Sequence, residues 1–234
     1  MRVLPSIVVA HAEQDRTASQ CVWTIVVAGG SGTRFGRPKQ YEPLGDQRII
    51  DRSVAVAREV SDGVVVVVPA ADLQFETSVF APAVRVVAGG ATRSDSVRAG
   101  LVAVDMAATI VCVHDAARPF ATAHLYQSVV DAVVAGADGV VPGVAVTDTI
   151  KLVAADGSVE ATPLRDRLVA VQTPQAFRAV VLRAAHRLGA DGTDDAALVE
   201  AAGGRVVVVA GEADNRKVTH PDDLMWAQTL VEGR

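Results

Sequence analysis

The chain has 234 residues, half of them hydrophobic, which is enough to bury the core of one large domain. A net charge of -5 without a long block of one sign, and an aromatic content of 4%, argue against nucleic acid as a main partner. Two cysteines are too few for a disulfide framework, and no apolar stretch reaches the ~18 residues of a membrane span. We therefore expect a cytoplasmic protein without a membrane partner.

Residues 1–20 precede the first predicted strand. A basic start, a short apolar run and an Ala-x-Ala string at 10–12 are ingredients of a secretory signal. Pro5 and Ser6 interrupt the apolar run, so we expect a poorly ordered N-terminal extension, with a targeting role as the alternative. Residues 21–234 are expected to form a single domain.

Buried strands and helices alternate from residue 25 to residue 134. Apolar runs predict strands at 25–28, 64–68, 84–87 and 110–113. Helical spacing and cap residues predict helices at 49–60, 73–80, from Ser94 or Asp95 towards 106, and at 125–134. Such alternation implies right-handed crossovers and a mostly parallel sheet between two helical layers, a Rossmann-like α/β fold with three α/β/α layers.

The pattern changes after residue 139. Extended stretches on both sides of an Asp156-Gly157 turn predict a β-arm at about 144–171 that projects from the sheet. Projecting arms often form dimer contacts, and we expect a homodimer. After the arm, the sequence predicts a helix at about 176–188, a short helix capped by 193–195, a strand at 205–209 and a last helix opened by His220-Pro221.

The loop after the first strand gives the strongest functional signal. Its glycines let a ligand approach the backbone, and consecutive N–H groups there can bind an anion. Phe35 stands where a dinucleotide fingerprint needs its third glycine, and the chain has no P-loop string. The loop therefore predicts a nucleoside triphosphate cradle. Its glycine-rich and basic members are Gly29, Gly30, Ser31, Gly32, Arg34, Arg37 and Lys39.

Two further loops that follow strands carry polar residues, at 89–96 and at 114–119. Because ligands bind beyond the carboxyl ends of parallel strands, we expect these loops to converge with the glycine loop. Arg34 and Lys39 suit the stabilisation of extra negative charge on an α-phosphate, and otherwise form a solvated basic loop. Asp115 is placed to hold Mg²⁺, or else to cap a turn.

The loop at 89–96 has two interpretations. Gly90 and Ser96 can meet a base or ribose, or they can form an ordinary helix cap. Arg93 can hold the loops together. His114 is not expected to bind a metal, because no His or Cys cluster accompanies it.

Seven strings in order resemble the 2-C-methyl-D-erythritol 4-phosphate cytidylyltransferase family, over about residues 23–230. The strings are G-G-S-G-T-R-F-G-R-P-K-Q-Y, G-G-A-T-R-S-D-S-V, V-H-D-A-A-R-P, D-T-I-K, Q-T-P-Q-A-F, T-D-D-A and D-N-R-K-V-T-H-P-D-D-L. The resemblance implies a nucleotidyltransferase fold and a Mg²⁺-dependent transfer of CMP from CTP to a polyol phosphate, with release of pyrophosphate. The acceptor phosphate would attack the α-phosphate in line, without a covalent enzyme intermediate.

The resemblance also assigns residues. The catalytic set would be Arg34, Lys39, Asp115 and Lys217, with Asp115 also serving the metal. The nucleotide would be bound by Ala28, Gly29, Gly30, Ser31, Gly32, Gly90, Arg93 and Ser96. The acceptor would be bound by Asp115, Arg118, Thr149, Arg165, Thr173 and Lys217, with Thr149, Arg165 and as a third candidate Lys217 supplied across a dimer. Without the resemblance, the arm charges are best interpreted as solvated.

Three alternatives stay open. Related ribitol-5-phosphate cytidylyltransferases share the Ala-Gly-Gly-Ser-Gly form of the loop, although the H-D-A-A-R-P string favours methylerythritol phosphate. Two strings depart from the pattern of the methylerythritol phosphate family: Ala91 stands where many members carry an acidic residue, and Val-Ala-Gly-Gly replaces the frequent Pro-Ala-Ala-Gly. A non-catalytic nucleotide-binding regulator of the same fold is disfavoured, because binding alone does not require Arg34, Lys39 and Asp115 together. A sugar nucleotidyltransferase using UTP or GTP is disfavoured by the Pro-Lys-Gln and Asp-Ala-Ala-Arg-Pro strings.

Overall fold

The computed structural model describes residues 20–30 and 35–233. Residues 1–19 of the predicted N-terminal extension and the glycine-loop candidates Ser31, Gly32 and Arg34 lie outside the described residues. Within them, no helix is long and apolar enough to cross a membrane.

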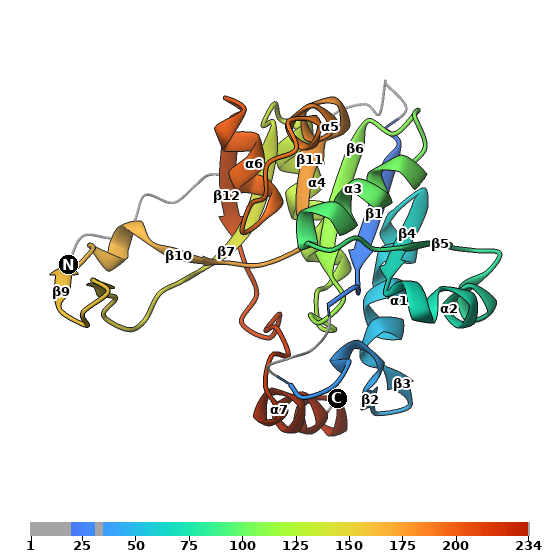
Figure 1. The fold of residues 1–234 in the computed structure, drawn as a ribbon, viewed down its shortest axis with the longest axis horizontal. Coiled ribbons are helices and arrows are strands. Elements are labelled where there is room, and N and C mark those ends of the chain that lie inside the picture. Colours follow the sequence, from blue (N-terminus) through green and yellow to red (C-terminus); the bar gives the residue numbers. More distant parts are fainter. Residues whose placement is uncertain (1–19, 31–34, 234) are drawn as a thin grey trace.

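An eight-stranded mixed sheet forms the centre of the molecule (Figure 1). Its strand order is β10-β7-β11-β6-β1-β4-β5, with β12 paired to β7. The pairs of β1 with β4 and β6, of β4 with β5 and of β7 with β12 are parallel, as the alternating pattern predicts. The strands are β1 Val22–Val27, β4 Gly63–Val68, β5 Arg85–Ala88, β6 Ile110–Asp115, β7 Gly139–Ala145, β10 Val169–Val171, β11 Gln175–Arg178 and β12 Val206–Ala210.

Two apolar cores lie on opposite faces of this sheet. Successive strand residues point to opposite faces, so Val26 faces one core while its neighbour Ile25 faces the other. The first core packs against α1 (Ile49–Val60) and α4 (Ala123–Val134), and the second against α3 (Arg93–Ala103), α5 (Ala179–Arg187) and α6 (Asp195–Ala201). The expected three-layer α/β/α fold is confirmed.

The helix predictions at 49–60 and 73–80 match α1 and α2 (Leu73–Phe80) residue for residue. The prediction for α3 places the cap too late. Thr92 is the N-cap, and its hydroxyl accepts a hydrogen bond from the Asp95 N–H at 3.0 Å. The Asp95 carboxylate in turn accepts a hydrogen bond from the Thr92 N–H. The resulting capping box starts the helix a residue or two earlier than predicted.

The helix prediction at about 176–188 is wrong over its first residues. Residues 175–178 form β11, an antiparallel strand between β6 and β7. Ala176 and Phe177 are fully buried there, and the helix α5 starts at Ala179. The short apolar string is compatible with a helix or with a strand. It becomes a strand because β6 and β7 supply the hydrogen bonds on both sides.

A third apolar cluster fixes the C-terminal helix α7 (Pro221–Glu232) below the sheet. There Leu224 and Ala227 pack against Phe35, Leu44 and Phe120. Phe35 is the first described residue after the glycine loop, so the packing of α7 fixes the chain at that point. The short strands β2 (Pro43–Leu44) and β3 (Gln47–Arg48) and the 3₁₀ turns at Lys39–Tyr41 and Ala70–Asp72 complete this side.

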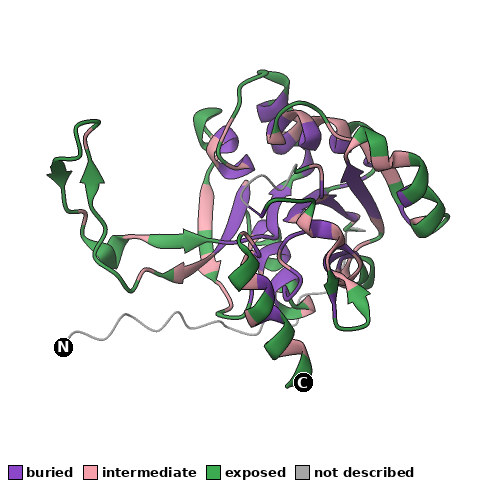
Figure 2. Cartoon of the chain, turned by 60° about the horizontal axis from the view of Figure 1, so that its bottom comes forward, coloured by how far each residue is buried: buried purple, intermediate pink, exposed green. Residues whose placement is uncertain are grey.

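The arm stands apart from the rest of the molecule (Figures 1 and 2). Its hairpin consists of β8 (Leu152–Val153) and β9 (Val159–Ala161), followed by a 3₁₀ turn at Arg165–Arg167 and by β10. Figure 2 shows it as almost entirely exposed. Leu164, for example, is 74% exposed.

Candidate functional site

A pocket of about 410 Å³ lies at the carboxyl ends of the central strands. The loops after β1, β5 and β6 line it, so the predicted convergence of the three loops is confirmed for the described residues. We call it the glycine pocket. The predicted site residues that line it are Ala28, Gly29, Gly30, Lys39, Gly90, Arg93, Ser96, Asp115 and Lys217.

The loop after β5 is held in one shape by Ser96. Its hydroxyl donates to the Thr92 carbonyl at 3.0 Å and accepts the Gly90 N–H at 3.2 Å. A Cβ on Gly90 would lie 2.2 Å from the Asp95 Cβ, so this position requires glycine. Ser96 therefore fixes the loop from within α3 rather than capping the helix, whose N-cap is Thr92, and its bonds present the Gly90 backbone to the pocket.

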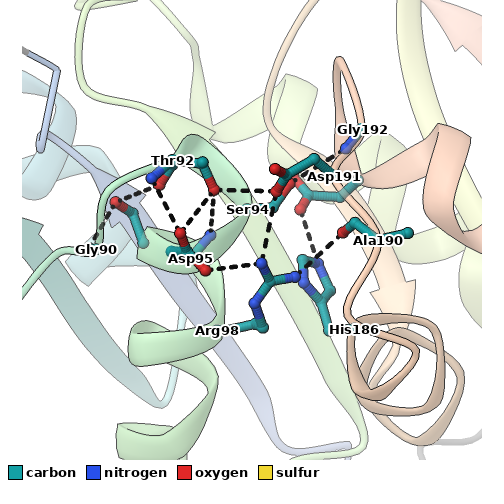
Figure 3. Close-up of polar contacts among 11 residues, drawn as sticks. Gly90, Thr92, Ser94, Asp95, Arg98, His186, Ala190, Asp191 and Gly192 are labelled. Carbon is teal, nitrogen blue, oxygen red and sulfur yellow. Dashed lines mark hydrogen bonds and ion pairs between the residues drawn. The ribbon is translucent and has the colours of Figure 1, made fainter.

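The start of α3 is also fixed from the other side. Figure 3 shows Thr92, Ser94 and Arg98 facing the loop before α6. Thr92 Oγ1 lies 3.0 Å from an Asp191 carboxylate oxygen, and Arg98 donates to the Ala190 carbonyl at 3.2 Å. The helix end that lines the pocket is thus preorganised by a segment about 95 residues away in sequence.

Arg93 connects the pocket to this same region. Its Nη2 lies 2.8 Å from Asp195 Oδ2, and its Nε lies 3.7 Å from Asp115 Oδ1. Asp195 is fully buried and also contacts His186 Nε2 at 3.0 Å. The guanidinium is therefore shared between two carboxylates, which supports the expectation that Arg93 holds loops together. The sequence predicted only a capping role around 193–195, and no local pattern shows that Asp195 meets Arg93.

Asp115, at the end of β6, is surrounded by positive charge. Lys217 Nζ donates to its Oδ2 at 2.6 Å. Burial alone would raise the pKa of Asp115, but Lys217 and Arg93 outweigh burial and hold this pKa well below its usual range. The carboxylate is therefore ionised throughout the neutral range.

Hydrogen bonds made by Thr173 and His114 fix the end of β6. His114 is fully buried, and its Nε2 can only donate to the Arg118 carbonyl, at 3.2 Å. Its Nδ1 then accepts from the Thr173 hydroxyl at 3.1 Å, and that hydroxyl accepts the Asp115 N–H at 3.0 Å. Burial lowers the pKa of His114 to about 4, so the ring is neutral. Of a packed and a surface position, the structure gives His114 the packed one.

Lys39 lies in the 3₁₀ turn that follows the glycine loop and lines the glycine pocket. Its neighbour Gln40 is buried and donates to the Gly30 carbonyl at 3.4 Å, which ties the turn to the loop. Arg37 instead faces solvent and forms two hydrogen bonds with Glu42, at 2.5 and 2.7 Å. Only Lys39 of these two cations is directed to the pocket.

A second pocket, of about 440 Å³, lies next to the first, and we call it the arginine pocket. Arg118, Arg216 and Lys217 line it, and Lys217 lines the glycine pocket too. Arg118 donates to the carbonyls of Asn215 and Val171, at 2.8 and 3.2 Å, while its buried Nε has no hydrogen-bond partner among the residues that the structure describes. Both hydrogen bonds go to backbone carbonyls rather than to carboxylates, so the charge of the guanidinium is available to bind an anion.

Thr149 and Arg165 do not line either pocket in their own chain. Both lie in the exposed arm, where Arg165 donates to the Thr147 carbonyl at 3.0 Å. The structure therefore brings together the described candidates of the domain and leaves the two arm candidates apart from them.

The residues fit one kind of magnesium site. Among the described residues, no group of three or more His, Cys, Asp or Glu could hold a metal ion by itself. Mg²⁺ often takes one or two carboxylates and completes its shell with substrate phosphates and water. The Asp115 carboxylate, at the border of an electropositive pocket, fits that arrangement.

Comparisons with known proteins agree with this geometry. The family model described as 2-C-methyl-D-erythritol 4-phosphate cytidylyltransferase (IspD) matches residues 22–233. Proteins of that name from Rhodococcus jostii and Nocardia farcinica are 45% and 43% identical to this chain, over 90% and 91% of it and 95% of each relative.

Solved structures show the same fold. The 4-diphosphocytidyl-2C-methyl-D-erythritol synthase of Anaerococcus prevotii superposes with a TM-score of 0.80 at 28% identity, covering 91% of this chain and 99% of that one. The 2-C-methyl-D-erythritol 4-phosphate cytidylyltransferase of Thermus thermophilus gives 0.74 at 31% identity, covering 89% and 98%. The chain belongs to the 2-C-methyl-D-erythritol 4-phosphate cytidylyltransferase family.

Proposed function

We propose that this chain transfers CMP from CTP to 2-C-methyl-D-erythritol 4-phosphate, giving 4-diphosphocytidyl-2-C-methyl-D-erythritol and pyrophosphate. The observation that carries the proposal is the family match over 22–233, together with the electropositive glycine pocket at the strand ends. Family membership favours this acceptor over ribitol 5-phosphate and favours catalysis over a purely regulatory role.

In the proposed complex, cytosine and ribose lie against the backbone of the first two loops. Gly29 and Gly30 allow close approach, and Ser96 holds the Gly90 backbone in place. Ala28, buried just after β1, lines the glycine pocket as well. Ser31 and Gly32 are proposed to contact the nucleotide as well. Recognition through backbone groups suits a flat base that needs fixed donors and acceptors.

The phosphates are proposed to meet the cations of the pocket. Lys39 would stabilise the extra charge on the α-phosphate, assisted by Arg34, and Arg93 and Lys217 line the same pocket. Fixed charges of this kind lower the barrier because they need no reorganisation during the reaction. The acceptor's phosphate oxygen then attacks the α-phosphorus in line, and pyrophosphate leaves. A phosphate monoester is already anionic, so neither a general base nor a covalent intermediate is required.

Mg²⁺ is proposed as the cofactor, with Asp115 as its protein ligand. When bound, it would neutralise charge on the triphosphate and on the leaving pyrophosphate. Lys217 holds Asp115 in place at 2.6 Å and offers its remaining donors to the acceptor. Removal of divalent cations with a chelator should abolish turnover, and restored turnover on adding Mg²⁺ would support this assignment.

The acceptor side is proposed to be completed by a second copy of the chain. Arg118 would bind the acceptor directly, and Thr173, whose hydroxyl hydrogen is engaged by His114, would shape the site or accept one hydrogen bond. Thr149 and Arg165 would come from the partner's arm, in a homodimer built on that arm. Apolar side chains exposed on the arm, such as Val153 at 57%, support this arrangement. We also infer a cytoplasmic location, where CTP is available.

The test is pyrophosphate release by the purified protein with CTP and Mg²⁺. Methylerythritol phosphate and ribitol 5-phosphate are offered in parallel, and UTP and GTP replace CTP in matched reactions. We expect release with CTP and methylerythritol phosphate. Release with ribitol phosphate alone would contradict the proposed acceptor, and CTP binding without release from either would favour a regulatory role.

A further inference from the structure

The arginine pocket contains one positive charge more than the predicted acceptor-binding residues Arg118 and Lys217 provide. Besides Arg118 and Lys217 it contains Arg216, which the sequence reasoning did not single out. Among the described residues that line it, Asp223 is the one carboxylate. Lys217 also bonds the carboxylate of Asp115, so three cations face two carboxylates, and the remaining positive charge favours an anionic ligand.

Arg216 is only weakly engaged by that carboxylate. Its Nη2 lies 3.8 Å from Asp223 Oδ1, beyond hydrogen-bond distance. Asp223 uses its other oxygen to accept the N–H groups of Thr219 and His220, both at 2.8 Å, at the start of α7. The carboxylate is thus fixed by its capping bonds, and the Arg216 donors remain able to bind a ligand.

The Arg216 guanidinium is nevertheless held in a defined place. Its Cζ lies 4.4 Å from the centroid of the Trp226 ring. Trp226 in turn packs edge-on against Phe120, at 5.6 Å and 82°, in the third apolar cluster, to which α7 contributes. Stacking occupies the face of a guanidinium and leaves its N–H edges open, the geometry in which arginine binds phosphate.

The position of the pocket identifies the ligand class. Lys217 lines both pockets, so a molecule in the arginine pocket would lie beside one in the glycine pocket. If the nucleotide occupies the glycine pocket, as the proposed function requires, the neighbouring molecule is the acceptor, which carries a phosphate monoester.

Resting on that proposed function, we propose that Arg216 is a binding residue for the phosphate group of the acceptor. It would add one charge-assisted contact to those of Arg118 and Lys217, and it would contribute to affinity for the acceptor rather than for CTP. Because the acceptor phosphate is also the nucleophile, the contact would further orient the attacking oxygen.

The experiment compares Arg216→Gln with Arg178→Gln in steady-state kinetics, each substrate being varied at saturating levels of the other. Arg178 is a matched control, since its side chain is 54% exposed against 52% for Arg216 and it lies 3.6 Å from a carboxylate, that of Asp138. It sits beside Ile110 at the opposite end of β6 from Asp115. We expect Arg216→Gln to raise the KM for methylerythritol phosphate about tenfold, the factor that one charged hydrogen bond is worth.

In the same variant, the KM for CTP should stay within about twofold of the wild type, as should both constants in Arg178→Gln. Arg216→Lys should recover part of the loss, because it keeps the charge without the planar fork. Arg216→Met keeps an apolar contact with Trp226 and should behave as Arg216→Gln if charge is what matters. An unchanged KM for methylerythritol phosphate, or equal rises in both KM values, would overturn the proposal.

Failure of this inference is distinguishable from failure of the proposed function. If the wild type releases no pyrophosphate with methylerythritol phosphate, the proposed function is wrong and the inference falls with it. If the wild type is active and the Arg216 variants match it, only the role of Arg216 is wrong. Thermal unfolding of each variant shows whether a kinetic change comes from lost folding, and Arg216→Lys then serves as the test variant.

Discussion

The glycine pocket and the arm differ in how far a single chain fixes them. At the pocket, Ser96 lines the site and Thr173 lies behind β6; both are buried, and each holds a backbone group that borders the site. In the arm, Leu152 and Leu164 are 52% and 74% exposed. The glycine pocket is therefore held by packing and hydrogen bonds within one chain, whereas the side chains of the arm hairpin are largely exposed.

The largest expected effect tests the preorganised side. Lys39→Ala should lower kcat by about 10² to 10³, the usual cost of removing one fixed donor that stabilises transition-state charge. Calorimetric affinity for CTP in the absence of acceptor should change by less than about tenfold, since part of the contact forms only in the transition state. Arg37→Ala is the control in the same segment, because Arg37 faces solvent and Glu42. Near-normal turnover of Lys39→Ala would refute the catalytic role of Lys39.

The next effect tests whether the arm completes a neighbouring site. Arg165→Ala should lower activity by about 10-fold to 100-fold, because it removes a charged contact to the acceptor. Mixing it with Lys39→Ala after unfolding and refolding together should restore roughly a quarter of the wild-type activity, since half of the dimers would contain one intact site. No recovery, with dimers present by light scattering, would mean that Arg165 acts within its own chain or not at all.

Two glycines separate fold requirements from ligand requirements. Gly90→Ala places its Cβ 2.2 Å from that of Asp95, so we expect a loss of about 1–3 kcal/mol in unfolding free energy and a KM for CTP about tenfold higher. At Gly30, a Cβ meets no atom of the described residues within 4 Å. Gly30→Ala should therefore keep its melting temperature and still raise the KM for CTP. Equal melting temperatures for both variants would contradict the packing argument.

The smallest effect concerns the sheet beneath the pocket. Cys112 is fully buried on β6, and burial raises the pKa of its thiol to about 12, while Cys21 is partly exposed. The thiolate is the reactive form, so a disulfide reagent at pH 8 should modify Cys21 quickly and Cys112 only after denaturation. Rapid modification of Cys112 in the native protein would show that this part of the sheet opens more easily than its packing indicates.

Much of the architecture followed from local pattern. The apolar runs that became β1, β4 and β6 are buried on both faces, and the period of the apolar residues defined α1 and α2. Strand β11 did not follow, because the hydrogen bonds that select it come from β6 and β7. The Thr92 cap was missed because Thr92, Ser94 and Asp95 are all good N-cap residues and each could begin the helix.

The sequence by itself determined the alternating α/β order, the three loops that follow strands and the family, since these depend on residue type and spacing along the chain. Only the tertiary structure decided that Arg93 is shared by Asp115 and Asp195, that His114 orients Thr173 and that Arg216 stacks on Trp226 beside Lys217. These pairs join residues from separate elements. Their partners are set by strand register and helix packing, which fix where distant side chains meet and which charges remain open to a substrate.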